Sequence, residues 1–93
     1  MTTIKPLLCF PTQVGTFYIV ETEDKLIHPV FDGRGLGAYR EIWQAIKDLT
    51  ENATHAVRHP ETGVILDTSK LGISSDPKNW KAMELKAPVA TKI

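Results

Sequence analysis

The sequence has one cysteine, no long run of apolar residues and no excess of charge of one sign. Cys9 has no second cysteine to pair with, which excludes an internal disulfide and a zinc site built on a CxxC pair. Eleven basic residues balance eleven acidic ones, so no large field attracts nucleic acid or an anionic membrane. No run approaches the ~18 apolar residues that span a bilayer, and residues 7–10 are too short for a secretory signal. We therefore expect a cytoplasmic protein without membrane contact.

What the chain has is the composition of an ordinary folded domain. Hydrophobic residues make up 42% and charged residues 24% of its 93 residues, far from a disordered composition. Residues 1–14 contain two prolines and no periodicity, which predicts an N-terminal arm. We expect one α+β domain over residues 15–86 and a flexible tail over residues 87–93.

The first half of this domain has the pattern of an antiparallel β-meander. Residues 16–22 and 25–31 are rich in β-branched and aromatic side chains, with Glu23-Asp24 between them. The turn signal at residues 32–35 allows residues 36–39 to return as a short third strand. If Glu23 and Asp24 form a two-residue loop, one face holds Phe17, Ile19, Leu26, His28 and Val30, and the other holds Tyr18, Val20, Ile27 and Phe31.

The periodicity then changes to that of a helix, over residues 40–52. One helical face collects the apolar side chains Ile42, Ala45, Ile46 and Leu49. Asn52 is a typical helix stop, whereas the start lacks a Ser, Thr or Asp cap. This amphipathic helix is expected to pack on the meander.

Two further elements are predicted after the helix. Residues 55–59 and 64–67 have the pattern of a second β-hairpin, with a Pro-Glu-Thr-Gly turn between them. Ser75-Asp76-Pro77 is typical of a helix start, so we expect a short C-terminal helix that carries Trp80 and Met83. Because so short a chain has little core to spare, Trp80 is expected to pack on it.

Two patterns that resemble functional motifs fit structural roles better. Gly33, Gly35 and Gly37 have the wrong spacing for a nucleotide-binding loop and suit turns and tight strands. His55 and His59 have HxxxH spacing, but in a strand they lie about 13 Å apart, too far to share a metal. We accordingly expect no cofactor and no metal.

Other reactive residue types also have simpler interpretations. His28 interrupts an apolar strand, which is typical of a neutral histidine with one hydrogen-bond partner, and a catalytic role is the alternative. Cys9 has no basic partner predicted nearby and is expected to be inert. Asp67, Thr68 and Ser69 suit a turn that ends a strand.

Several segments together carry a resemblance to known sequences. They are Gly15–Glu21 (GTFYIVE), His28–Gly33 (HPVFDG), Leu36-Gly37-x-Tyr39, Asp48-Leu49 and Asp67–Ile73 (DTSKLGI), with Trp80. Over residues 15–80 the chain resembles short uncharacterised proteobacterial proteins with no assigned function. The resemblance implies a self-contained bacterial domain and transfers no catalytic residue. A threonine that follows the tyrosine in those proteins is replaced here by Arg40-Glu41.

We predict from these observations a small non-enzymatic module that binds another protein, with its oligomeric state left open. An exposed strand edge and uncovered aromatic side chains are the features that favour such a contact. The candidate partner-binding residues are Tyr18, His28, Phe31, Arg34, Tyr39, Trp43 and Trp80.

Two alternatives from other classes remain. One is a nucleic-acid-binding module, by topological likeness to the three-strand-plus-helix domains at the N-termini of phage-type integrases. It would use Lys25, Arg34, Arg40 and Lys47, although acidic residues on the first hairpin oppose nucleic-acid binding. The other is a small enzyme centred on His28 with Asp32 and Tyr39.

Overall fold

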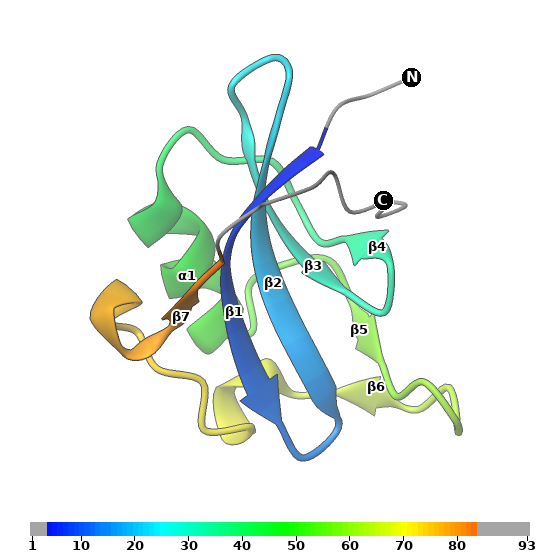
Figure 1. Cartoon of the computed structure of the whole chain (residues 1–93). Helices are drawn as coiled ribbons and strands as arrows, with labels where there is room; N and C mark the ends of the chain where they lie inside the picture. Colours follow the sequence, from blue (N-terminus) through cyan, green and yellow to red (C-terminus); the bar gives the residue numbers. More distant parts are fainter. Residues whose placement is uncertain (1–3, 84–93) are drawn as a thin grey trace.

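The computed structural model of the chain describes residues 4–83, which form a sheet, one α-helix and a smaller hairpin (Figure 1). In chain order the elements are β1 (Ile4–Thr12), β2 (Gly15–Thr22), β3 (Ile27–Phe31), β4 (Arg34–Gly35), α1 (Ile42–Thr50), β5 (Val57–Arg58), β6 (Ile65–Leu66), the 3-10 helices η1 (Thr68–Lys70) and η2 (Pro77–Asn79), and β7 (Lys81–Ala82). The expected flexible tail, residues 87–93, lies outside the described residues. Within residues 4–83, no helix has the length and apolar character needed to cross a bilayer.

The main sheet has five strands in the order β4-β3-β2-β1-β7, and each pairing is antiparallel. Strands β5 and β6 form the separate second hairpin. The prediction of an α+β fold, in which one amphipathic helix packs on a β-meander, is therefore confirmed.

Residues 4–12 form β1, which corrects the expectation that residues 1–14 are an arm. Leu8 and Phe10 pair with buried residues of β2, and the Phe10 ring lies 5.3 Å from the Trp80 ring, centroid to centroid. Pro6 lies at a β-bulge, where the missing amide hydrogen is tolerated. The strand is therefore defined by its pairing with β2, because residues 4–12 show no alternation of polar and apolar residues.

The turn between β2 and β3 has three residues rather than two, which corrects the predicted faces. The Thr22 amide donates to the Leu26 carbonyl at 3.0 Å, and Lys25 adopts a left-handed conformation with φ 66°. This is the geometry of a three-residue hairpin loop with a bulge. The extra residue shifts β3 by one position, so Phe17 pairs with Phe31 and not with Val30.

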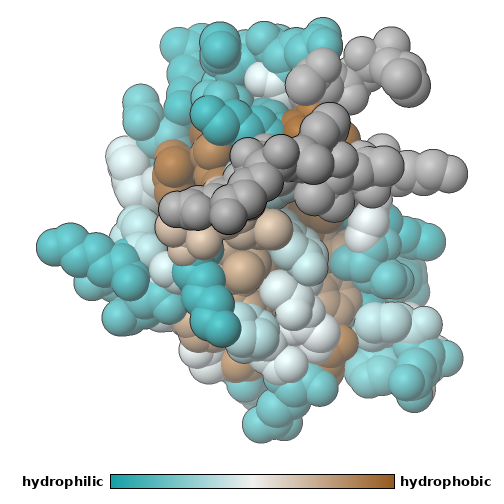
Figure 2. Space-filling model, in the orientation of Figure 1, coloured by the Kyte–Doolittle hydropathy of each residue, from teal (hydrophilic) through white to brown (hydrophobic). Residues whose placement is uncertain are grey.

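The shifted register decides which side chains reach the core. Phe17, Ile27 and Phe31 now share the face that packs toward α1, and the Phe17 and Phe31 rings stack with centroids 4.3 Å apart. The opposite face, here called the outer face, carries the half-buried Tyr18 and His28 and the buried Val20 and Val30. The face of the molecule seen in Figure 2 carries hydrophilic residues around its margin and neutral to hydrophobic ones at its centre.

The β3–β4 turn is Asp32-Gly33, and both residues have positive φ, 52° and 75°. A two-residue turn of this kind requires a left-handed conformation at both positions, and Asp-Gly is a favoured pair because both residues tolerate it. The strand expected at residues 36–39 is instead Arg34–Gly35, followed by an isolated bridge between Ile27 and Tyr39. Gly37, with φ 153°, lies between β4 and Tyr39, where the pairing with β3 is interrupted.

Helix α1 is shorter than the predicted residues 40–52, since Glu41 precedes it without a side-chain capping bond. Its end is as expected, because Asn52 adopts φ 57° just beyond the last turn. Ala45, Ile46 and Leu49 are fully buried against the sheet.

The C-terminal part of the described chain packs back on this core. Asp76 caps η2 by accepting from the Lys78 amide at 2.9 Å, with Pro77 at the first position, as the sequence predicted. The short helix ends before Trp80 and Met83 instead of carrying them. Trp80 is 5% exposed and its indole N–H donates to the Ser74 carbonyl at 2.9 Å, so the prediction that it packs on the core is confirmed.

Candidate functional site

Trp43 lies on the solvent side of α1 and is 56% exposed. It borders an open groove of about 430 Å³, here called the α1 groove. The groove walls include Tyr39, Arg40, Trp43, Lys47 and Asp48. Because the opposite side of α1 is buried against the sheet, the indole stands on a rigid support.

A hydrogen bond fixes one wall of the α1 groove. The Tyr39 hydroxyl donates to Oδ2 of Asp48 at 2.9 Å, which ties the segment before the helix to α1. Burial and this bond to a carboxylate raise the pKa of Tyr39 to about 12, so the hydroxyl remains a donor at neutral pH. Arg40 and Lys47 are both exposed beside Trp43, which gives the groove a positive character.

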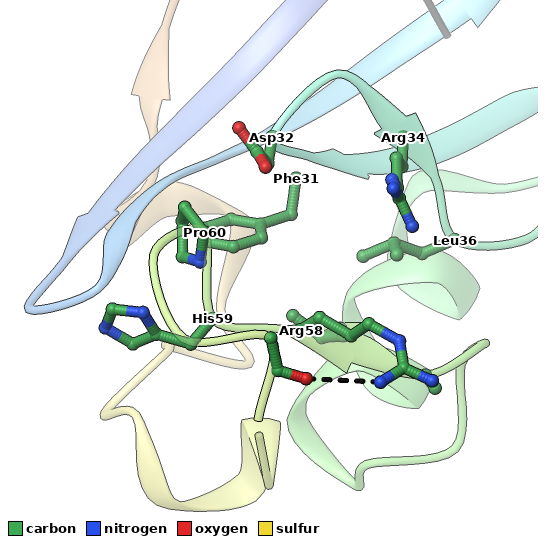
Figure 3. A pocket seen from close by; sticks show the side chains of 10 residues that line it. Phe31, Asp32, Arg34, Leu36, Arg58, His59 and Pro60 are labelled. Carbon is green, nitrogen blue, oxygen red and sulfur yellow. Dashed lines mark hydrogen bonds between the residues drawn. The ribbon is translucent and has the colours of Figure 1, made fainter. Parts of the chain in front are cut away.

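A second concave site lies between the β3–β4 turn and the β5–β6 hairpin, and is here called the hairpin pocket (Figure 3). Its volume is about 160 Å³. Its floor is formed by the apolar side chains of Phe31, Leu36 and Val57, which are each at most 3% exposed. Pro60 adds an apolar wall from the hairpin turn.

Two arginines supply the charge of the hairpin pocket. Arg34 on β4 is exposed, and its guanidinium makes no hydrogen bond or ion pair with any residue in the range 4–83. Arg58 on β5 donates from Nη1 to the Gly63 carbonyl at 3.1 Å. Figure 3 shows the Arg34 side chain pointing toward Leu36, on the side of the pocket that also holds Arg58. Asp32 is the acidic residue among those that line it.

His59 shapes this pocket through the turn that it stabilises. Its Nδ1 accepts from the amides of Glu61 and Thr62, at 3.1 and 3.4 Å, which places the proton of the neutral ring on Nε2. In Figure 3 the ring points away from the two arginines. The turn closes with the Gly63 amide donating to the His59 carbonyl at 2.9 Å.

The seven predicted partner-binding residues are distributed over several surfaces. Tyr39 and Trp43 meet in the α1 groove, and Phe31 and Arg34 meet in the hairpin pocket. Trp80 is buried, which removes it as an exposed anchor. The two that remain, Tyr18 and His28, lie on the outer face of the sheet.

The residues of the enzyme alternative are not gathered into one site. Nε2 of His28 lies 3.3 Å from the Thr22 hydroxyl, and that hydroxyl donates to Asp24. The bond from Thr22 is the main cause that lowers the pKa of the Asp24 carboxyl. Among described residues, no hydrogen bond links His28 to Asp32 or Tyr39, the latter being bonded to Asp48.

The four cations of the nucleic-acid alternative are also divided. Arg40 and Lys47 border the α1 groove, whereas Arg34 borders the hairpin pocket. Lys25 lies in the β2–β3 turn, beside Glu21 and Glu23. These cations therefore do not line one continuous stripe.

Sequence reasoning missed Arg58 and Leu36 as site residues. The two turn signals were recognised, at Asp32-Gly33 and at residues 60–63, and each has an arginine close by. That these turns face one another follows only from tertiary packing, because the sequence pattern does not reveal their proximity. His55 and His59 belong to no cluster of three metal-binding side chains within the described range.

Comparison with known proteins adds no relative: a scan of protein-family models, a search of curated proteins and a search of solved structures each found no match to the chain.

Proposed function

We propose that this protein is a small non-enzymatic module that binds another protein through the α1 groove. The observation that supports this most directly is Trp43, a tryptophan 56% exposed on a helix whose other face is fully buried. Tryptophan is enriched among the residues that dominate binding energy at protein interfaces. Its ring offers large apolar area with little conformational freedom to lose.

The charges around Trp43 indicate the chemistry of the partner. Arg40 and Lys47 flank the indole, while Asp48 is already bonded to Tyr39. A complementary partner therefore carries an apolar side chain that packs on the indole and acidic groups that face the two cations. Such complementarity raises the association rate and makes it sensitive to salt.

Site-specific photo-crosslinking in expressing cells tests this assignment. A photoreactive residue at position 43 should capture one partner protein, whereas the same residue at position 65 should not. Ile65 is 60% exposed on β6, so it is a matched apolar position on another surface. The captured protein is then purified and titrated against wild type, Trp43→Ala and Ile65→Ala.

Trp43→Ala should weaken the affinity about thirtyfold, the threshold of an interface hot spot, and Ile65→Ala should change it less than about twofold. Added salt should slow association with wild type. Equal capture from both positions, unchanged affinity of Trp43→Ala, or recovery of nucleic acid in place of protein would contradict the proposal.

A further inference from the structure

The hairpin pocket combines an apolar floor with two guanidinium groups whose N–H donors are not all used by residues 4–83. The Arg34 guanidinium has no partner among residues 4–83, and Arg58 donates from Nη1 to the Gly63 carbonyl. A guanidinium is always charged at accessible pH and carries five N–H donors in a planar fork. That fork matches the two oxygens of a carboxylate.

The bond from Arg58 to Gly63 has a further effect on the pocket. It fixes the arginine against the hairpin turn, so less side-chain freedom is lost when its remaining donors bind a ligand. Arg34 follows the tight Asp32-Gly33 turn on β4, and this turn sets the position of Arg34 beside the pocket. Both cations thus start from backbone segments that hydrogen bonds hold in place.

The size and lining of the pocket limit the ligand further. Its volume of about 160 Å³ is close to the ~150 Å³ of a protein cavity that accepts benzene. The bottom of the pocket is closed by the apolar side chains of Phe31, Leu36 and Val57, and Pro60 adds an exposed apolar wall. Asp32 at the rim favours a singly charged carboxylate over a doubly charged phosphate, because like charges repel.

We infer that the hairpin pocket binds a small organic carboxylate of about benzene size. The carboxylate lies on Arg34 and Arg58, and the apolar body packs on Phe31 and Leu36. His59 positions the turn that carries Pro60 and takes no direct part. No residue of the α1 groove lines this pocket, so the carboxylate site and the proposed protein-binding function can be tested independently.

Titration of the full-length, ¹⁵N-labelled chain with benzoate, followed by amide chemical shifts, tests the site. Saturable shifts should centre on residues 31–36 and 56–63. Benzamide has the same shape without the charge and should bind at least about tenfold more weakly. Inorganic phosphate, which has the charge without the apolar body, should also bind more weakly than benzoate.

Arg34→Gln keeps most of the side-chain stem and should weaken benzoate binding at least about tenfold. Lys78→Gln removes an exposed charge on η2, away from the pocket, and should change the affinity less than twofold. The amide spectrum without ligand shows whether each variant is folded. Absence of saturable shifts, equal binding of benzamide or phosphate, or unchanged affinity of a folded Arg34→Gln variant would overturn the inference.

Discussion

Trp80→Ala should destabilise this protein more than any exposed substitution, because Trp80 joins the C-terminal segment to the core. The side chain is 5% exposed and its ring lies against that of Phe10. Its indole N–H also donates to the Ser74 carbonyl at 2.9 Å. Directly after it, β7 pairs with Leu8 and Cys9 of β1.

Two estimates of the free energy of unfolding that Trp80→Ala would lose agree with each other. An aromatic side chain buries roughly 150–250 Å², which at about 25 cal/mol per Å² corresponds to about 4–6 kcal/mol. Measured truncations of buried aromatic residues to alanine cost about 3–5 kcal/mol. A domain of this size has a total stability of only about 5–14 kcal/mol. The variant is therefore expected to lie close to the limit of stable folding.

Urea unfolding followed by circular dichroism measures the effect. With an m value of about 1.5 kcal/mol/M, the midpoint of Trp80→Ala should fall by about 2–3 M. Trp80→Phe retains a ring against Phe10 and should lose only about 1–2 kcal/mol. Trp43→Ala is the control, because a side chain that is 56% exposed should cost less than about 1 kcal/mol. Equal midpoints for Trp80→Ala and Trp43→Ala would refute the packing argument.

Three further substitutions test single contacts. Thr68 is 1% exposed, and its hydroxyl donates to the Leu49 carbonyl at the end of α1. Thr68→Val leaves that carbonyl without its donor and should lower the free energy of unfolding by about 1–3 kcal/mol, measured by thermal unfolding. Thr68→Ser keeps the hydroxyl and should lower it less. Gly15 has φ 138°, and a Cβ added to it would lie 3.1 Å from Cε1 of Phe31. A Cβ added to Gly63 would meet nothing within 4 Å, so Gly15→Ala should destabilise the protein more than Gly63→Ala. Folding raises the pKa of Tyr39 from 10.0 to about 12, which means that the folded protein favours the protonated hydroxyl. The stabilisation that this hydroxyl contributes is therefore complete below pH 10 and is lost as the pH rises through 12. Tyr39→Phe should remove that part of the alkaline decline in unfolding free energy.

The features that sequence predicted well are those encoded by a few neighbouring residues. Asn52 ends α1, and Asp76-Pro77 begins η2, because a cap needs only local geometry. The register of β3 was wrong because it depended on the conformation of Lys25, whose positive φ has no signature in that residue type. Strand β1 was missed because Pro6 is compatible with a strand only at its bulge, which pairing with β2 defines.

The candidate sites show the same division between local and tertiary information. Trp43 was named as a candidate from its residue type, but its exposure depends on which side of α1 packs on the sheet. Phe31 and Arg34 were also named, whereas Arg58 was not, because it reaches them only when the second hairpin packs beside the β3–β4 turn. A pocket formed by two distant turns cannot be derived from either turn alone.

The α1 groove and the hairpin pocket have no lining residue in common, and this has a measurable consequence. Substitutions at sites without shared partners usually combine additively, within about 0.3–0.5 kcal/mol, or about twofold in affinity. Trp43→Ala should therefore leave benzoate affinity unchanged within twofold, and Arg34→Gln should do the same for the protein partner. If benzoate changed partner affinity by about tenfold, the two sites would be thermodynamically coupled, and partner binding would have to change benzoate affinity by the same factor. Titrating each ligand in the presence of the other distinguishes two independent surfaces from one linked system.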